Sequence, residues 1–183
     1  MKYPTVFHLL VQEFEKAKIP VILIGGFAVN YYKVSRATGD VDILMMDEHF
    51  EKASSLLSLA GYKEVVRGHA FARFKSGQPL LMDLDVLFVD KETFSGMVNE
   101  AREVEIEGNK IKVASLNHLI ALKLHSLKNN FSHREDPDLR DIVRLIQENQ
   151  MAMTKEEFRE LCLKYGTQEL YERVIGIVRQ WKS

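Results

Sequence analysis

Two strongly apolar segments of the chain each contain a pair of aspartates two positions apart. The segments are residues 40–46 and 80–89, and the aspartates are Asp40, Asp42, Asp83 and Asp85. Runs of branched and long apolar residues predict buried strands, where aspartate is disfavoured and a charged group is costly to bury. The fold must therefore place these four carboxylates where other charges offset theirs.

The spacing of each pair puts its two carboxylates on the same side of a strand, because side chains alternate with a period of two. Clustered carboxylates repel one another and take up protons unless cations compensate them. Hard divalent cations prefer oxygen ligands, and two ions about 3.5–4 Å apart can clamp the attacking and leaving oxygens of a phosphoryl or nucleotidyl transfer. The pairs therefore predict a metal site. For single residues an alternative stays open: Asp40 also fits a strand entry, and Asp83 also fits a solvent-facing edge strand.

Gly25-Gly26 joins a predicted buried strand, residues 21–24, to a short predicted helix, residues 27–34. Glycine lets the backbone approach a ligand closely, and the N–H groups at a helix start favour phosphate. A steric reason for the two glycines is the alternative, since many strand-to-helix turns contain them. The sequence has no GxGxxG fingerprint and no GxxxxGK[ST] phosphate loop. The glycines gain meaning from the Asp-Val-Asp segment that follows them.

The order of predicted elements separates an α/β core, residues 1–114, from a helical segment, residues 115–183, that is expected to pack on it. Strands are predicted at residues 21–24, 40–46, 62–66, 70–75, 80–89, 104–106 and 110–113. Gly108-Asn109 predicts the turn of a hairpin between the last two strands.

Capping residues mark several predicted helices. Asp47 is expected to cap a helix that ends at Gly61, and Asp90 is expected to cap the helix that follows the last apolar strand. In the helical segment, Asp136 is the expected N-cap of a helix with Pro137 in its first turn.

The bulk composition excludes several classes of protein. The formal net charge is -1, so no overall field attracts nucleic acid or an anionic membrane. Cys162 is the only cysteine, which excludes an internal disulfide and a zinc site made of several thiolates. The first ten residues lack a signal-peptide pattern, and no apolar run approaches the roughly 20 residues that span a bilayer. A cytoplasmic protein with no membrane partner is expected.

The combination of an apolar strand, Gly25-Gly26, a short helix and Asp40-Val41-Asp42 resembles the nucleotidyltransferase superfamily that includes DNA polymerase beta. The longer string from Gly25 to Asp42 looks like the AbiEii-type and related minimal nucleotidyltransferases of bacteria and archaea. Residues 115–123 and 134–142 resemble later motifs of the same group, so the resemblance covers roughly residues 20 to 146. It implies an α+β fold, in which a mixed sheet flanked by helices is followed by a C-terminal helical segment.

The resemblance also implies roles for individual residues. Gly25 and Gly26 would approach the nucleotide phosphates, and Asp40 and Asp42 would hold Mg²⁺ or Mn²⁺. A third carboxylate would complete the metal site, and Asp85 fits that position slightly better than Asp83 because it stands in an apolar-Asp-apolar-apolar context. Arg36 and Thr38, just before the acidic pair, are candidates for phosphate contacts. A loop arginine in solvent is the alternative for Arg36.

A lysine on an apolar helix stripe adds an independent observation. The stripe consists of Leu116, Leu119, Ile120, Leu124 and Leu127, and Lys123 lies on it. A lysine there is costly unless it meets a charge or extends to solvent, and a triphosphate is a suitable partner. Asp138 and Asp141 lie three positions apart beside another apolar helix face, so we predict a Lys123–Asp141 pairing near the nucleotide. Stabilisation of a helix start by Asp138, and a salt bridge of Asp141 to Arg144 or Lys123, are the alternatives.

The sequence therefore predicts an enzyme that moves a nucleoside monophosphate from a nucleoside triphosphate to an acceptor hydroxyl or phosphate, a reaction of the EC 2.7.7 type. By resemblance, the acceptor includes tRNA or another macromolecule, as for a toxin-like enzyme with an antitoxin partner. A lincosamide- or aminoglycoside-type antibiotic adenylyltransferase is the first alternative. A non-catalytic nucleotide-binding protein is the second, and the acceptor, the base preference and the oligomeric state stay open.

Overall fold

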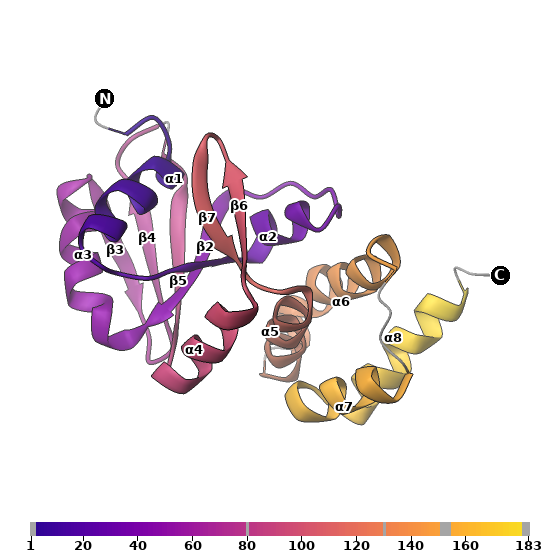
Figure 1. The fold of residues 1–183 in the computed structure, drawn as a ribbon. Coiled ribbons are helices and arrows are strands. Elements are labelled where there is room, and N and C mark those ends of the chain that lie inside the picture. The colour runs from indigo at the N-terminus through magenta and orange to yellow at the C-terminus, as the bar shows by residue number, and fades with distance from the viewer. Residues whose placement is uncertain (1–2, 80, 130, 151–154, 181–183) are drawn as a thin grey trace. The chain divides into compact units, whose positions relative to one another are not determined.

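The computed structural model describes residues 3–79, 81–129, 131–150 and 155–180 (Figure 1). The chain divides into two compact units. The first comprises residues 1–28 and 37–115, and the second comprises residues 29–36 and 116–183.

A mixed sheet of seven strands forms the centre of the first unit, in the order β3-β4-β5-β2-β1-β7-β6. The strands are β1 (Ile22–Ile24), β2 (Asp40–Met46), β3 (Tyr62–Arg67), β4 (Phe71–Ser76), β5 (Asp83–Val89), β6 (Arg102–Ile106) and β7 (Asn109–Val113). β2 runs parallel to β5, and β1 runs parallel to β7, whereas the other neighbours are antiparallel. All seven predicted strands are confirmed. β5 is shorter than predicted, and Leu80 lies outside the described residues.

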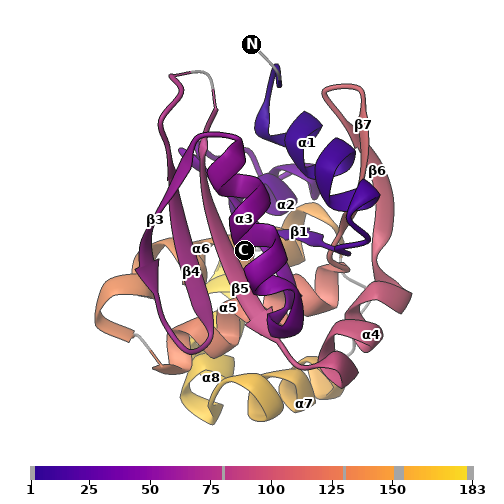
Figure 2. The same cartoon turned by 90° about the vertical axis from the view of Figure 1, so that its left-hand side faces the viewer.

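The helices of the first unit are α1 (Val6–Leu9), which continues as a π-helical stretch (Leu10–Phe14), α3 (Phe50–Leu59) and α4 (Lys91–Glu100). α1 and α3 lie on the same face of the sheet (Figure 2). Phe50 of α3 contacts Phe74 of β4 and Phe88 of β5, with ring centroids 6.2 and 5.4 Å away. Because side chains alternate along β5, Leu84 and Val86 share this buried face with Phe88, and Asp83 and Asp85 point to the opposite face.

Two local predictions in this unit are wrong in detail. Asp47 does not cap α3, because a 3₁₀ turn (Asp47–His49) precedes that helix and the Asp47 carboxylate accepts a hydrogen bond from Arg67, at 2.7 Å. The hairpin turn lies at Glu107-Gly108, one residue earlier than predicted. Both residues have positive φ, 50° and 75°, as a two-residue type I′ turn requires.

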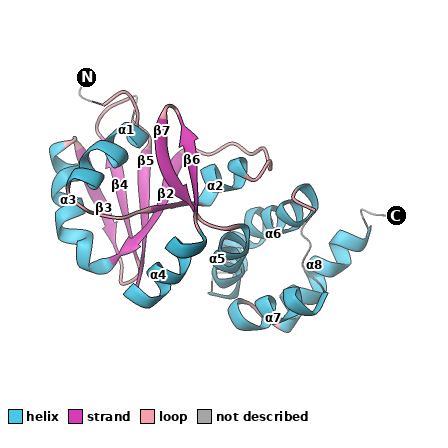
Figure 3. Ribbon diagram, in the orientation of Figure 1, coloured by secondary structure: helices cyan, strands magenta, loops and turns pink. Residues whose placement is uncertain are grey.

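The second unit is helical and contains α5 (Leu116–Asn129), α6 (Phe131–Glu148), α7 (Lys155–Tyr165) and α8 (Gln168–Gln180) (Figure 3). α6 begins six residues before Pro137, so Pro137 is inside the helix and the predicted N-cap role of Asp136 is wrong. Proline in the first turn is a preference, which arises because a proline elsewhere loses one backbone hydrogen bond. The correction also places Asp138 well inside the helix, away from the helix start that was one explanation for it.

Helix α2 (Gly25–Tyr31) begins directly at the two glycines, two residues earlier than predicted. Residues 29–36, its second half and the loop after it, belong to the second unit. Hydrogen bonds from α6 and from the residue directly after it hold this stretch. Arg144 donates to the carbonyl of Ser35 at 3.1 Å, and Asn149 donates to the carbonyl of Tyr32 at 2.8 Å.

Candidate active site

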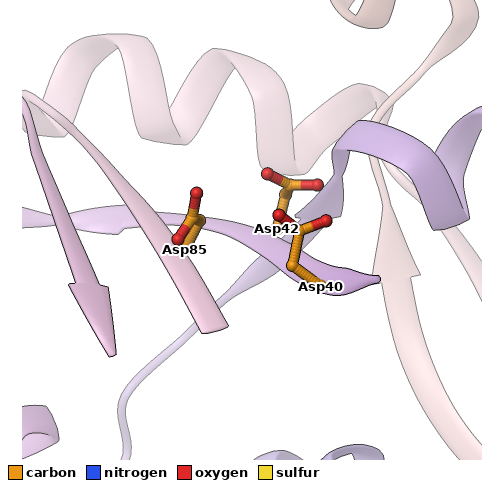
Figure 4. A group of neighbouring side chains, drawn as sticks. All are labelled: Asp40, Asp42 and Asp85. Atoms are coloured by element: carbon orange, nitrogen blue, oxygen red, sulfur yellow. The ribbon is translucent and has the colours of Figure 1, made fainter. Parts of the chain in front are cut away.

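Three aspartates from neighbouring strands form a cluster in the first unit. The parallel register of β2 and β5 places Asp40 opposite Asp83 and Asp42 opposite Asp85. Carboxylate oxygens of Asp40, Asp42 and Asp85 all lie within 4.8 Å of one another, and the three residues are half-buried (Figure 4). We call these three residues the acidic triad. The triad arises because two Asp-apolar-Asp segments lie side by side in register.

The two glycines leave room for the side chains of this site. A Cβ atom on Gly25 would lie 1.9 Å from Oδ2 of Asp42, and a Cβ on Gly26 would lie 2.5 Å from Oγ1 of Thr38. Gly25 also has φ of +61°, a conformation that costs other residues energy. The backbone N–H of Gly26 points to Oδ2 of Asp42 at 3.4 Å. The structure therefore shows a steric reason for the two glycines: a side chain at Gly25 would displace Asp42 of the acidic triad.

Thr38 supports Asp40. Its hydroxyl Oγ1 lies 3.1 Å from the backbone carbonyl of Asp40 and 3.2 Å from Oδ1 of the same residue. The threonine thus holds a carboxylate of the triad. The sequence indicated only a phosphate contact for Thr38 and not this role.

Arg73 on β4 pairs with the third carboxylate. Its Nε donates to Oδ1 of Asp85 at 2.8 Å and its Nη2 donates to Oδ2 at 2.6 Å, a bidentate arrangement. These hydrogen bonds raise the pKa of the guanidinium, and the charges of Asp40 and Asp42 add to the effect. Sequence analysis missed Arg73. The alternation Phe71-Ala72-Arg73-Phe74 indicates its face, but its position opposite Asp85 follows only from the antiparallel register of β4 and β5.

Asp83 is engaged elsewhere. Its Oδ1 accepts a hydrogen bond from the backbone N–H of Ser76 at 3.0 Å, and its charge adds to the effect of burial in raising the pKa of Tyr62. The Tyr62 hydroxyl donates to the carbonyl of Met82 at 2.8 Å. Asp83 therefore anchors the turn between β4 and β5, and the acidic triad contains Asp85.

The second unit contains a different group of charges. Lys123 of α5 and Asp138 and Asp141 of α6 are only 6%, 5% and 6% exposed. The Lys123 ammonium lies 2.9 Å from Oδ1 of Asp138 and 2.7 Å from Oδ2 of Asp141. Nη1 of Arg36 donates to the same Oδ2 of Asp141 at 2.6 Å. We call these four residues the Lys123 cluster. The structure shows the predicted Lys123–Asp141 pairing, and it makes Arg36 part of an ion network.

Arg36 is further held by the helix that precedes it. Its N–H donates to Oδ1 of Asn30 at 2.8 Å, and its carbonyl accepts from Nδ2 of Asn30 at 3.0 Å. The Lys123 cluster therefore connects residues 29–36 to both α5 and α6 within the second unit.

The donor set of the acidic triad suits a hard divalent cation. Three carboxylates contribute oxygens from one face of two paired strands, and the absence of a side chain at Gly25 leaves space for Asp42. Mg²⁺ and Mn²⁺ prefer such oxygen ligands and are commonly held by a few carboxylates together with substrate phosphates. The residues present thus fit the cation that the resemblance implies.

The comparisons with known proteins identify the class of enzyme to which this fold belongs. A family model described as "Uncharacterised nucleotidyltransferase" matches residues 5–182, nearly the whole sequence, and the chain belongs to this family. The superfamily resemblance is confirmed, whereas the comparisons give no support to the narrower AbiEii-type assignment. A comparison with curated protein sequences gives no match.

Solved structures of similar fold include three with a high coverage of both chains. The antibiotic-resistance factor ANT(2'')-Ia is 14% identical with a TM-score of 0.58, and the alignment covers 97% of this chain and 91% of that one. An antigenic nucleotidyltransferase-like protein from Paracoccidioides brasiliensis is 21% identical, with a TM-score of 0.59 and coverages of 96% and 86%. The lincosamide antibiotic adenylyltransferase LnuA is 18% identical, with a TM-score of 0.55 and coverages of 81% and 96%. These likenesses confirm the α+β nucleotidyltransferase fold.

Among the described residues, no helix combines the length and the apolar character that crossing a bilayer requires.

Proposed function

We propose that this enzyme moves a nucleoside monophosphate from a nucleoside triphosphate to an acceptor hydroxyl or phosphate, with Asp40, Asp42 and Asp85 as the ligands of Mg²⁺ or Mn²⁺. The observation that carries the proposal is the acidic triad, whose oxygens lie within 4.8 Å of one another on β2 and β5. When bound, divalent cations there supply positive charge for the phosphate oxygens and activate the attacking oxygen.

The residues around the triad have defined tasks in this proposal. Asp40 and Asp42 bind the cations from β2, and Thr38 holds the Asp40 carboxylate in place. Gly25 and Gly26 allow the backbone to lie close to Asp42, and their N–H groups are the predicted partners of the nucleotide phosphates. Asp85 completes the ligand set and takes part in activating the acceptor.

Nucleotide contacts by the Lys123 cluster stay a prediction. Lys123 already lies within 3 Å of two carboxylate oxygens, so a phosphate would compete with Asp138 and Asp141 for it. The Arg36 side chain is 32% exposed and that of Lys123 is 8% exposed, so Arg36 is the more accessible of the cluster's two cations. An Arg36→Gln variant that raises the KM for nucleoside triphosphate without lowering kcat would support a phosphate contact there.

The acceptor divides into two candidate classes. A macromolecular acceptor such as tRNA, an antitoxin partner and a cytoplasmic location stay predictions of the sequence. A small-molecule acceptor is supported by the likeness to ANT(2'')-Ia and LnuA, because their chains are aligned over 91% and 96% of their lengths. A separate crystal structure of ANT(2'')-Ia is a complex with adenylyl-2''-tobramycin, and the LnuA structure is lincomycin-bound.

Transfer of label from each of the four α-labelled nucleoside triphosphates tests the proposal. The full chain is incubated with Mg²⁺ and either cellular RNA or a panel of aminoglycosides and lincosamides, beside Asp42→Asn as the matched inactive control. Labelled RNA that Asp42→Asn does not produce would favour the macromolecular acceptor, and labelled antibiotic would favour the small molecule. No transfer to any acceptor, together with nucleotide binding that ignores Mg²⁺, would contradict the enzyme reaction proposed here.

A further inference from the structure

Arg73 occupies the carboxylate that would complete the metal site. Both oxygens of Asp85 accept hydrogen bonds from the guanidinium, at 2.8 and 2.6 Å, and one Asp85 oxygen also belongs to the triad of oxygens within 4.8 Å. A carboxylate has about four lone-pair positions, so it can accept more than one partner. A dication and a guanidinium on the same carboxylate nevertheless repel each other at such distances.

We propose that Arg73 is a displaceable internal cation of the metal site, which pairs with Asp85 in the metal-free enzyme and competes with divalent cations for it. The inference rests on the proposed metal-binding role of the triad and adds a residue that sets its metal affinity. Arg73 acts through Asp85, so it is a positioning residue.

The surroundings of Arg73 allow such an exchange. Its side chain is 44% exposed and that of Asp85 is 20% exposed, so the guanidinium can move into water without leaving a buried charge unpaired. Ion pairs this close to solvent contribute little to stability, which makes them easy to open. The contacts of Lys123 differ, since its side chain and both partners are no more than 8% exposed. Release of Lys123 would leave buried charges, whereas release of Arg73 would not.

The consequence is a triad that is compensated in both states. Without metal, Arg73 offsets part of the repulsion among the three carboxylates, to which it is also coupled by the charges of Asp40 and Asp42. With metal bound, the cations take over that task and Arg73 gives up its bidentate geometry. Metal binding must then break the Arg73–Asp85 ion pair. The metal affinity is therefore weaker than that of the same three carboxylates without Arg73, by the free energy needed to break this pair.

Binding of Mn²⁺ alone to the full chain, followed by calorimetry, tests the competition. We expect Arg73→Gln to bind Mn²⁺ about three- to tenfold more tightly than the unmodified chain, the effect of one positive charge a few ångströms from a dication in a well-solvated site. Arg73→Lys keeps the charge without the fork and is expected to fall between the two. Lys75→Gln is the matched control, because Lys75 is exposed on the same face of β4, two residues from Arg73. It removes the same charge and should change the affinity less than about twofold.

An NMR measurement follows the arginine itself. The Nε–H resonance of Arg73, assigned by through-bond correlation to its backbone resonances in the unmodified chain, should move toward the position of a solvated arginine as Mg²⁺ is added. A resonance that stays unchanged at saturating Mg²⁺ would overturn the proposal, because Arg73 would then remain on Asp85. Mn²⁺ affinity of Arg73→Gln equal to or weaker than that of the unmodified chain would overturn it as well.

The design separates this inference from the proposed function. If the unmodified chain binds Mn²⁺ and Asp42→Asn does not, the metal site stands, and the Arg73 variants decide the competition alone. If the unmodified chain binds no Mn²⁺, both the metal site and the competition are contradicted. Thermal unfolding of each variant checks the fold, and the NMR titration uses the unmodified chain, so it decides even if a variant fails to fold.

Discussion

The two units of this protein each hold a group of aspartates, and the two groups are built in opposite ways. The acidic triad on β2 and β5 is half-buried, its carboxylate oxygens lie within 4.8 Å of one another, and Arg73 pairs with Asp85. The Lys123 cluster is buried around two carboxylates that lie between one lysine and one arginine, so its formal charges cancel.

The difference separates a site that can accept a cation from a network that already contains its own. Three carboxylate oxygens close together at a partly exposed position suit a divalent ion, as the proposed function requires. A neutral, buried network holds segments together. Removal of one of its members is destabilising because the buried charges of the remaining members lose their partner. Residues 29–36 are the segment that the Lys123 cluster holds to α5 and α6.

The largest expected effect concerns the buried network. Lys123→Met should lower the free energy of unfolding by about 3–5 kcal/mol, because two buried carboxylates lose their shared cation. Denaturant unfolding followed by circular dichroism measures the change. Lys128→Met is the control, since Lys128 is exposed on the same helix, and it should cost less than about 0.5 kcal/mol. Equal losses in the two variants would mean that the cluster is not a stabilising network.

The opposite pattern is expected in the acidic triad. Asp42→Asn should lower kcat/KM by more than about 100-fold, since even residues that only support metal ligands cost roughly 10–100-fold when changed. Its free energy of unfolding should stay within about 1 kcal/mol of the unmodified chain, because a residue near solvent is replaced by one of the same shape. Asp83→Asn serves as the comparison within β5, and it should lower activity far less than Asp85→Asn. A larger loss in Asp83→Asn would assign the third ligand to Asp83.

Two glycine substitutions compare a crowded position beside the triad, Gly25, with an open position in α4, Gly96. Gly25→Ala should cost about 1–3 kcal/mol from its positive φ alone, and its Cβ would displace Asp42, so activity should fall with stability. Gly96 lies in the middle of α4, where a Cβ atom would have no neighbour within 4 Å, so Gly96→Ala should add about 0.5–1 kcal/mol of stability. Thermal unfolding and the transfer assay measure both. A Gly25→Ala enzyme with full activity would show that Asp42 does not need its present position.

Cys162 gives the smallest effect and reports on the second unit alone. The thiol is fully buried in α7, and burial raises its pKa to about 12, so it should resist alkylation in the folded protein. Lys123→Met should speed its labelling in dilute denaturant, since local opening needs less free energy. Asp42→Asn should leave the labelling rate near that of the unmodified chain. Mass spectrometry of iodoacetamide-treated samples measures the rates, and equal acceleration by both variants would contradict separate roles for the two clusters.

Local patterns predicted most of the elements, because burial of apolar residues imposes periods of two and 3.6 on short stretches of chain. The strand of residues 40–46 and the helix capped by Asp90 are examples, and the Asp90 side chain accepts from the N–H of Thr93 at 2.8 Å. Asp47 shows where such reasoning ends. Aspartate is a residue type common at helix N-caps, but the Asp47 carboxylate accepts a hydrogen bond from Arg67 of β3 instead.

Long-range partners could not be read from spacing. Arg73 is twelve residues from Asp85 in a hairpin whose register the turn sequence does not specify, and Arg36 is 105 residues from Asp141. For Arg36 the sequence offered only a phosphate contact or exposure to solvent. The pairing with Asp141 was missed because the position of α6 and the direction of its side chains are not local properties of the sequence around Arg36.

By itself the sequence determined the identities of the two acidic strands, the Gly-Gly turn and the membership in a nucleotidyltransferase family, because each depends on short apolar and glycine patterns. Only the tertiary structure decided that Asp85 joins Asp40 and Asp42 while Asp83 anchors a turn, and that Lys123 lies between two aspartates. The physical reason is register: pairing β2 with β5 and packing α5 on α6 bring distant charges within hydrogen-bonding distance, and burial then determines which charges must cancel.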